Sequence, residues 1–321
     1  MSHGQCFDPT TGPPAKTLHT TARKNGAMTS APHRDPHRIL SIQSSVAYGH
    51  VGNSAATFPL MRRGLEVWPV YTVHFSNNTS YESWRGPMLA ASDILDVVAG
   101  IDDRGVLGDC DGVLSGYQGA ADVGAAIVEI VRLVKGRNPA AIYCCDPVLG
   151  DVDRGIYVRP GIPDFMRSEV VPVADVITPN QFELGLLTGL PTSTLAEVLK
   201  AAYAARDLGP DIVLVTSVVT DELAGQLSMV LVSRLGAWRV TTPLISQTFT
   251  GAGDLTAAVF VGALVEHGAG SGAVEALAET AAVAYGVLSI TAERGSRELQ
   301  LVAAQSEIAN PTQTFPVVRL D

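Results

Sequence analysis

Hydrophobic positions along the chain form short apolar runs that alternate with longer segments of helical spacing, beginning at Arg38. Short apolar runs are typical of buried strands, and longer amphipathic or Ala-rich segments are typical of helices. The predicted strands cover 38–43, 66–72, 111–115, 140–145, 176–178, 212–216, 226–233 and 237–242. The predicted helices cover 53–63, with Asn53 or Ser54 as N-cap, and 92–100, 121–134, 181–187, 195–208, 253–267 and 273–291.

This strand-then-helix order predicts an α/β fold with a mostly parallel sheet and helices on both faces. We expect residues 226–242 to form an antiparallel pair at the sheet edge. Residues 1–36 and 311–321 lack the alternation, and we interpret them as a disordered N-terminal extension and a C-terminal tail. Residues 37–310 then form one domain. Ligands of such sheets bind beyond the carboxyl ends of the strands, which makes the polar strand-to-helix junctions candidates for function.

The charge and the cysteines narrow the classes of function. The formal net charge is −10, and an acidic protein repels nucleic acid and anionic membrane surfaces. No uninterrupted apolar run reaches the roughly 20 residues of a membrane helix. The four cysteines include no CxxC pair, and Cys144 and Cys145 lie in a predicted buried strand. These features favour a reduced, cytoplasmic protein rather than a disulfide scaffold or a zinc site.

Lysine is scarce, and Lys16, Lys24, Lys135 and Lys200 are the whole set. None of them follows a glycine, so the sequence contains no GxxxxGK[ST] phosphate loop. If the protein uses ATP, it must therefore hold the phosphates with backbone amides, a metal ion or a few arginines.

One short motif offers such amides. Gly251, Ala252 and Gly253 precede Asp254 at the start of a predicted helix. Small residues let backbone N–H groups approach an anion, and the helix N-terminus adds unpaired donors and the positive end of the dipole. A carboxylate beside that site can accept a proton from an alcohol. The alternative is an ordinary Asp in a first helical turn, and a dinucleotide fingerprint is excluded because Thr256 stands where its third glycine should be.

Two groups of motifs carry a resemblance to known families. The segment 249–254 (FTGAGD) resembles the GxGD signature that closes ribokinase-like kinases. Residues 42–44 (IQS), 48–56 (YGHVGNSAA), 66–70 (EVWPV) and 73–79 (VHFSNNT) resemble the first part of pyridoxal kinases, and the similarity runs from about residue 38 to 308. The resemblance implies a ribokinase-like three-layer α/β/α sandwich and a homodimer. It also implies transfer of the ATP γ-phosphoryl group to the 5′-hydroxymethyl group of pyridoxal with Mg²⁺, and it leaves a monovalent cation such as K⁺ open.

The resemblance also implies roles for particular residues. Asp254 is the expected catalytic base, and the amides of Gly251, Ala252 and Gly253 are expected to steady the charge on the transferred group. The residues expected to contact pyridoxal, besides Asp254, are Ser44, Val51, Thr79 and Tyr117. Asn78 and Ser80 differ from the residues usual in the family, which affects the expected recognition of the pyridine ring.

For the nucleotide and the metal, the resemblance points to carboxylates at two strand ends. Asp146 and Asp151 lie in the segment 146–151 (DPVLGD), and Glu183 lies in the motif 178–183 (TPNQFE). These three are the expected Mg²⁺ ligands, Glu183 through water. The expected nucleotide contacts are Asp146, Tyr157 on a flap, Thr178, Glu183, Thr216 and Gly251. A polar turn at 146–151 and a capping box between Asn180 and Glu183 are the structural alternatives.

Other functions remain to be compared with this one. A related kinase for hydroxymethylpyrimidine or a sugar is the nearest alternative. A non-catalytic vitamin B6 carrier is another, although a carrier needs no base. A pyridoxal-phosphate-dependent enzyme needs a Schiff-base lysine, and only Lys135 and Lys200 lie within 37–310.

Overall fold

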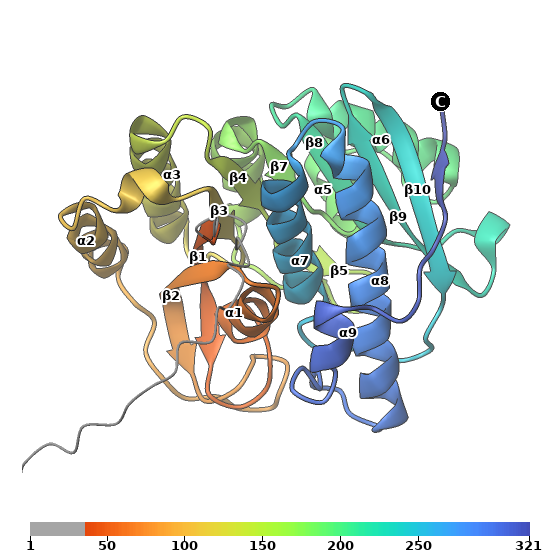
Figure 1. Cartoon of the computed structure of the whole chain (residues 1–321), viewed down its shortest axis with the longest axis horizontal. Coiled ribbons are helices and arrows are strands. Elements are labelled where there is room, and N and C mark those ends of the chain that lie inside the picture. The colour runs from red at the N-terminus through yellow and green to blue at the C-terminus, as the bar shows by residue number, and fades with distance from the viewer. Residues whose placement is uncertain (1–35) are drawn as a thin grey trace, which may run out of the picture. The chain divides into compact units, whose positions relative to one another are not determined.

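The centre of the fold is a nine-stranded sheet, seen in a computed structural model that describes residues 36–321 (Figure 1). The strand order is β11-β10-β9-β8-β7-β4-β3-β1-β2. The strands are β1 (Arg38–Val46), β2 (Glu66–Phe75), β3 (Gly112–Ser115), β4 (Ile142–Cys145), β7 (Val176–Ile177), β8 (Ile212–Val218), β9 (Gln226–Ser233), β10 (Gly236–Pro243) and β11 (Val317–Arg319). A separate short hairpin consists of β5 (Gly150–Asp151) and β6 (Gly155–Ile156).

The sheet is parallel from β2 to β8 and antiparallel from β8 to β11. The predicted pair at 226–242 is confirmed as β9 and β10, but it does not form the edge. Val317–Arg319 pairs with Trp238–Val240 and covers that side of β10. Part of the segment that we interpreted as a tail is therefore a strand. Its three residues are too few for a periodic signal, and it forms because β10 offers backbone groups that need partners.

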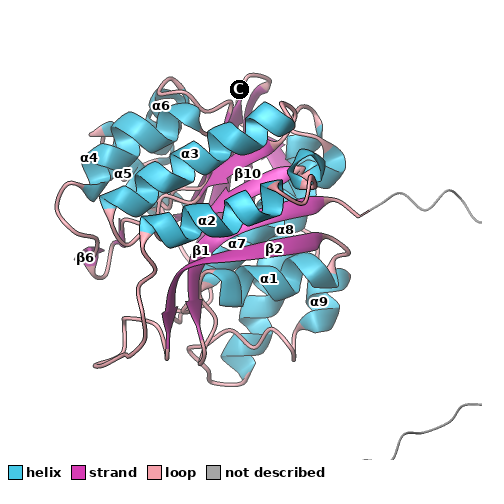
Figure 2. Cartoon of the chain, turned by 90° about the vertical axis from the view of Figure 1, so that its left-hand side faces the viewer, coloured by secondary structure: helices cyan, strands magenta, loops and turns pink. Residues whose placement is uncertain are grey.

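Helices cover both faces of the sheet, which confirms the predicted three-layer arrangement (Figure 2). On one side lie α2 (Ala91–Asp102), α3 (Ala121–Arg137), α4 (Ile162–Phe165), α5 (Gln181–Thr188) and α6 (Leu195–Arg206). On the other lie α1 (Asn53–Arg62), α7 (Ala252–His267), α8 (Gly272–Glu293) and α9 (Gln305–Ala309). Successive strand residues point to opposite faces: Leu40 joins the core under α2 and α3, whereas Ile39 joins the core under α1 and α7.

Helix α1 begins differently from the prediction. Its N-cap is Gly52, and no side chain caps the helix. The Asn53 side chain instead donates hydrogen bonds to the backbone oxygens of Ser41, Gln43 and Val70 at 3.2, 3.3 and 3.0 Å. Asn53 therefore pins the start of α1 to β1 and β2. This contact fixes the loop between β1 and α1 at the carboxyl end of the sheet.

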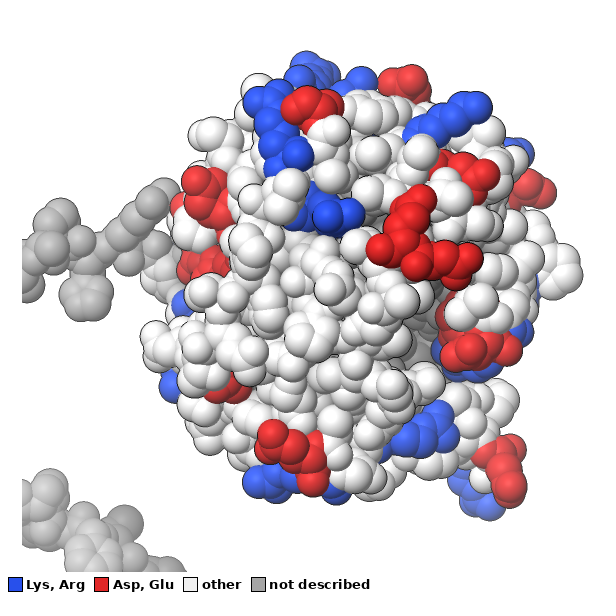
Figure 3. All heavy atoms as spheres, turned by 90° about the vertical axis from the view of Figure 1, so that its right-hand side faces the viewer, with Lys and Arg blue, Asp and Glu red and all other residues white. Residues whose placement is uncertain are grey.

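Helix α8 is, by length and composition, the one helix in residues 36–321 that is apolar enough to cross a membrane. More than half of that stretch is buried inside the fold, and its apolar side chains pack in the core with α7 and α1. Those contacts are the ones expected of a core helix. On the face drawn in Figure 3, basic and acidic side chains lie in small mixed groups around a wide uncharged area, rather than in a basic stripe.

Candidate active site

Polar side chains gather at the carboxyl ends of the parallel strands. These ends lie at the same edge of the sheet, because neighbouring parallel strands run in the same direction. The side chains there are Ser44 on β1, Tyr117 after β3, Asp146 after β4, Thr178 after β7 and Thr216 on β8. The backbone N–H of Asp146 donates to the Ser115 oxygen at 2.8 Å, and that of Thr178 to the Cys145 oxygen at 3.1 Å. Backbone hydrogen bonds to the neighbouring strands therefore fix where Asp146 and Thr178 leave the sheet.

The turn before α7 lies against the loop that follows β1. Gly251 has φ 87°, a left-handed conformation that glycine adopts without strain. A Cβ atom at this position would overlap the carbonyl oxygen of His50 and lie 3.0 Å from its carbonyl carbon. Helix α7 then begins at Ala252, and Gly253 is exposed. The exposed first turn offers backbone N–H groups to an anion at this edge of the sheet.

Asp254 is held in the first turn of α7. Burial raises the pKa of its carboxyl group to about 6, although the nearby backbone N–H groups of Gly52 and of Asp254 itself oppose the shift. A carboxylate with a pKa close to neutral is a stronger base than an exposed one and is still ionised at pH 7. The contact with Gly52 also joins the candidate base to the start of α1.

Asp146 faces the same turn. Its side chain is buried, and its Oδ1 accepts a hydrogen bond from Thr178 Oγ1 at 3.1 Å. Burial raises its pKa well above the usual range, and the negative charges of Glu183 and Asp254 raise it further. Its Oδ2 lies 4.0 Å from the point where a Cβ atom on Gly253 would stand. A site with several buried carboxylates and a nearby anion hole is one that a divalent cation would relieve of charge repulsion.

Glu183 forms the capping box of α5, as the structural alternative predicted. Its backbone N–H donates to Asn180 Oδ1 and its Oε2 accepts from the Asn180 N–H, both at 2.9 Å. Its Oε1 accepts from the backbone N–H groups of Leu149 and Gly150 at 2.8 and 3.3 Å. Burial raises the pKa of Glu183 to about 7, against these hydrogen bonds. The carboxylate thus orders the segment between Asp146 and the β5–β6 hairpin.

The ligand atoms of the three expected metal ligands are not all within 4.8 Å of one another in this structure. Asp151 pairs with Arg154, whose Nε lies 2.8 Å from Asp151 Oδ2, while the Arg154 guanidinium lies 4.6 Å from the centre of the Tyr157 ring. Within residues 36–321, a close group of three acidic or histidine side chains occurs instead at Glu266, His267 and Glu279. Arg63 already forms ion pairs with both of those glutamates.

The residues expected to contact pyridoxal lie on separate loops. Ser44 is buried beside Gly52, and Val51 packs against the cluster formed by Val46, Val73 and Phe75. Thr79 is exposed on the loop after β2. Tyr117 is partly buried, and its backbone oxygen accepts from Thr72 Oγ1 at 3.3 Å. Ser44 and Val51 thus flank the start of α1, close to the contact between Gly52 and Asp254.

Sequence reasoning missed one buried acid in this region. Glu298 lies between α8 and α9, and its carboxylate accepts hydrogen bonds from His50, Asn78 and Tyr81. It belongs to no recognisable spacing, because its partners are more than 200 residues away in the chain. A charged residue directly before the alternating apolar positions Leu299 and Leu301 was the one available signal.

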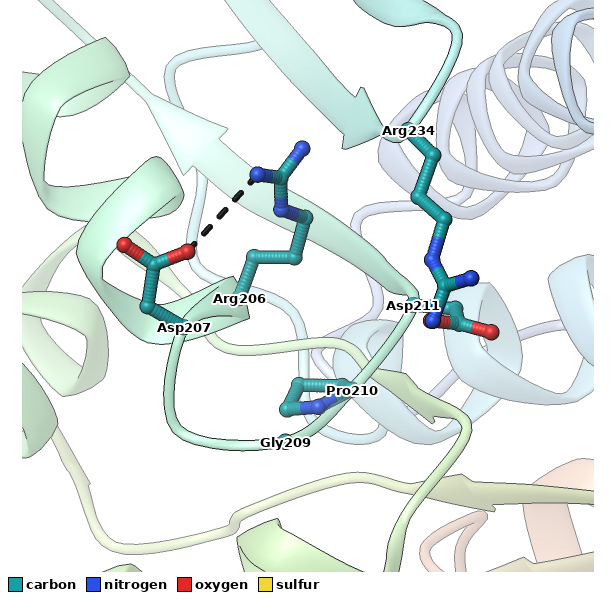
Figure 4. A pocket seen from close by; sticks show the side chains of 6 residues that line it. All are labelled: Arg206, Asp207, Gly209, Pro210, Asp211 and Arg234. Carbon is teal, nitrogen blue, oxygen red and sulfur yellow. Dashed lines mark ion pairs between the residues drawn. The ribbon is translucent and has the colours of Figure 1, made fainter.

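A surface hollow of about 270 Å³ lies elsewhere, beside the start of β8 (Figure 4). Two ion pairs border it: Arg206 lies 3.6 Å from Asp207, and Arg234 lies 2.7 Å from Asp211. Because this is the amino end of a parallel strand, the hollow lies at the opposite edge of the sheet from Asp146 and Asp254. Its arginines are already neutralised by carboxylates, which disfavours it as a phosphate site.

Comparisons with known proteins place these features in a family. The family described as phosphomethylpyrimidine kinase matches residues 119–290. A protein named pyridoxal kinase PdxY from Rubrobacter xylanophilus is 55% identical over 284 residues, which cover 88% of this chain and 97% of that protein. The chain belongs to the pyridoxal kinase family. A protein of the same name from Corynebacterium diphtheriae is 46% identical, covering 88% of this chain and 99% of that one.

Solved structures of the family have the same fold. The pyridoxal kinase from Leishmania donovani in complex with ADP and pyridoxine has a TM-score of 0.81 and 29% identity, covering 88% of this chain and 99% of that one. Its complex with ADP and ginkgotoxin has a TM-score of 0.82 and 28% identity. These findings confirm the predicted ribokinase-like fold and the prediction that the chain is a kinase. The carrier and the pyridoxal-phosphate-dependent enzyme are therefore not retained.

Proposed function

We propose that the protein transfers the γ-phosphoryl group of ATP to the 5′-hydroxymethyl group of pyridoxal, in the salvage of vitamin B6, with Asp254 as the base. The observation that carries this proposal is the placement of Asp254. It is a partly buried carboxylate with a pKa raised to about 6, one residue after a glycine turn that opens a 16-residue helix. Family membership supplies the reaction class, and relatives solved with ADP and pyridoxine support the pair of substrates.

In this proposal Asp254 accepts the proton of the 5′-hydroxyl group as its oxygen attacks the γ-phosphorus. The amides of Gly251, Ala252 and Gly253 donate hydrogen bonds to the transferred group. Such preorganised donors stabilise charge that develops in the transition state, because they need no reorientation during the reaction. The chain has no phosphate-loop lysine. In this proposal the backbone amides at the start of α7 are therefore the main donors to the phosphate.

Mg²⁺ fits the carboxylates on this edge of the sheet. Asp146 is buried without a cationic partner among its hydrogen bonds, and its pKa is raised by two neighbouring acids. Asp146 would hold the ion, with Glu183 acting through water and Asp151 once it is released from Arg154. The ion would supply positive charge to the phosphates. A K⁺ requirement stays part of the proposal, to be measured by replacing K⁺ with Na⁺ in the assay.

The remaining proposed contacts divide between the two substrates. The residues that would contact pyridoxal are Ser44, Val51, Thr79 and Tyr117. Those that would contact ATP are Tyr157, Thr178, Thr216 and Gly251. Thr216 is buried, and its backbone N–H donates to the Pro179 oxygen at 2.9 Å. This hydrogen bond fixes the backbone that carries the Thr216 hydroxyl group. The β5–β6 hairpin with Tyr157 is proposed to close over the nucleotide and exclude water.

The variant Asp254→Ala tests the assignment of the base. We expect it to bind ATP and pyridoxal by calorimetry and to lose nearly all turnover in an assay coupled to ADP release. Near-normal turnover in this variant would refute Asp254 as the base.

Hydroxymethylpyrimidine is a second candidate substrate, because the phosphomethylpyrimidine kinase family matches more than half of the chain. ADP release should be measured with pyridoxal, pyridoxine, pyridoxamine and hydroxymethylpyrimidine in parallel. We expect the highest kcat/KM for a B6 vitamer, and preference for the pyrimidine would replace our choice.

We also infer from the family resemblance that the protein is a cytoplasmic homodimer. Sedimentation velocity at the protein concentration of the assay tests the dimer, and a monomer there would refute it.

A further inference from the structure

Glu298 connects three segments that contribute to the candidate active site. Only 7% of the residue is exposed, and it lies in the extended segment between α8 and α9. Its two carboxylate oxygens accept three hydrogen bonds, from His50, Asn78 and Tyr81. Its backbone also forms a parallel bridge with Thr250. A buried charge of this kind persists only where hydrogen bonds replace its hydration.

The first segment is the loop between β1 and α1. The His50 backbone N–H donates to Glu298 Oε2 at 3.0 Å. Gly49 precedes it with φ 89°, and a Cβ atom there would collide with the Glu298 carboxylate. Two residues after His50, the backbone N–H of Gly52 lies near enough to the Asp254 carboxylate to lower its pKa. Residues 50–52 therefore connect the Glu298 carboxylate with the surroundings of the candidate base.

The second segment is the loop after β2, which carries Thr79. Asn78 Nδ2 and the Tyr81 hydroxyl donate to Glu298 Oε1 at 3.0 and 2.9 Å. The bond to Glu298 raises the pKa of Tyr81 to about 12. The oxygen of the Asn78 side-chain amide accepts from the Ser80 N–H at 2.9 Å. Thr79 thus lies between two residues that Glu298 or its partner Asn78 holds directly.

The third segment is the turn that contains the anion hole. The Thr250 N–H donates to the backbone oxygen of Arg297 at 2.9 Å, and Gly251 follows Thr250 directly. Arg297 also donates through Nη2 to Ser80 Oγ at 3.2 Å. The dipeptide Arg297-Glu298 therefore contacts the phosphate turn with its backbone and the proposed substrate loop with its side chains.

We propose that Glu298 is a positioning residue that holds the Thr79 loop and the His50 loop in register with the turn at Gly251–Asp254. Its carboxylate sets where pyridoxal stands relative to the base and the transferred phosphoryl group. Glu298 acts through these loops and touches neither substrate. The proposal rests on the proposed roles of Thr79 and Asp254. In this proposal Asn78, a position where the chain differs from the usual residue of the family, is the hydrogen-bond donor that binds the Glu298 carboxylate.

The variant Glu298→Gln tests this role. A glutamine keeps the shape, but one of its two terminal groups is an amide that donates, so it cannot accept from both His50 and Asn78. A misplacement of about 1 Å can lower a rate roughly 100-fold. We expect phosphorylation of pyridoxal to fall at least about ten-fold in kcat, with the KM for ATP unchanged. The ratio of pyridoxal phosphate to ADP formed should fall below one, because water then competes for the phosphoryl group.

Reversing the hydrogen bond provides a rescue. In the double variant Glu298→Gln with Asn78→Asp, the glutamine amide donates to the new carboxylate while its oxygen accepts from His50. We expect this variant to recover most of the lost kcat and a product ratio close to one. Asn78→Asp alone sets two carboxylates against each other and should be impaired.

Glu307→Gln is the matched control for loss of a buried glutamate. Glu307 is 8% exposed on α9 and accepts from the Thr312 N–H at 2.9 Å. The variant Glu307→Gln should lower the midpoint temperature of thermal unfolding and leave kcat and the product ratio at wild-type values. If Glu298→Gln behaves like Glu307→Gln, or if the double variant is worse than both single variants, the positioning role is wrong. Failure of the wild-type protein to phosphorylate pyridoxal would instead overturn the proposed function on which the role rests.

Discussion

Replacing Gly251 by alanine tests whether the turn before α7 must stay in its present place. The chain offers a close control, because Gly268, the C-cap of the same helix, has the same φ of 87° and no atom within 4 Å of the point where a Cβ atom would stand. At both sites an alanine must adopt a positive φ, at a cost of at least roughly 1–2 kcal/mol in stability, although ψ is 4° at Gly251 and 143° at Gly268. Only at Gly251 does the methyl group also meet the backbone of His50.

The size of that collision sets the expected loss of activity. The new Cβ would lie 3.0 Å from the His50 carbonyl carbon, whereas carbon atoms normally pack at about 3.5–4.0 Å. The overlap with the His50 carbonyl oxygen is more severe still, so the turn or the His50 loop must retreat by at least about 1 Å. A shift of that size at a reacting centre costs about 100-fold in rate. We expect Gly251→Ala to lose about that much kcat, because the amides and Asp254 move away from the transferred group.

The assay measures ADP release per folded molecule, with the folded fraction taken from thermal unfolding followed by circular dichroism. Gly268→Ala should unfold at a lower temperature but keep wild-type kcat. Equal activity of the two variants, or wild-type kcat in Gly251→Ala, would refute the idea that this turn is placed by its contact with His50.

Three further predictions concern the carboxylates. Burial raises the Asp254 pKa from 3.8 to about 6, so the ionised carboxylate destabilises the folded state, and the free energy of unfolding falls as pH rises from about 4 through 6. Asp254→Asn should therefore raise the free energy of unfolding by up to about 3 kcal/mol at pH 8 and leave it unchanged below pH 4. Urea titrations at both pH values measure this difference. Glu197→Ala removes the capping box of α6 and should cost about 0.3–1.5 kcal/mol in stability. Glu183→Ala also leaves the Leu149 and Gly150 N–H groups without their acceptor, so it should cost more stability and raise the KM for ATP. Equal changes in stability and in the KM for ATP in the two variants would contradict this. Chelation of divalent cations should abolish turnover, and Asp146→Asn should need more Mg²⁺ for half-maximal rate; an unchanged Mg²⁺ titration would exclude Asp146 as a ligand.

The layers of the fold could be predicted because each long element carries its own pattern. The Ala-rich helices α7 and α8 and the buried strand β4 are legible from residues that are adjacent in the chain. Strand β11 is not, because Val317–Arg319 becomes a strand only when β10 is present beside it. Asn53 has the side chain of a helix cap, but tertiary contacts with three strand oxygens outweigh that local preference.

The candidate site shows the same division. The turn at Gly251–Asp254 and the capping box at Asn180 and Glu183 are local motifs, and their geometry follows from spacing. The pairing of Asp151 with Arg154 depends on how the β5–β6 hairpin folds back, which no spacing reveals. Glu298 depends on contacts that span more than 200 residues, so its role emerges only when the loops are placed together.

The pH dependence of kcat/KM for pyridoxal tests the central claim, that Asp254 is the base, most directly. The free enzyme must carry Asp254 ionised, so kcat/KM should fall with a slope of one below a pH of about 6. The small residual activity of Asp254→Asn should be independent of pH across the same range, because no base remains to be protonated. An Asp254→Asn variant that kept wild-type turnover with the same fall near pH 6 would contradict this account.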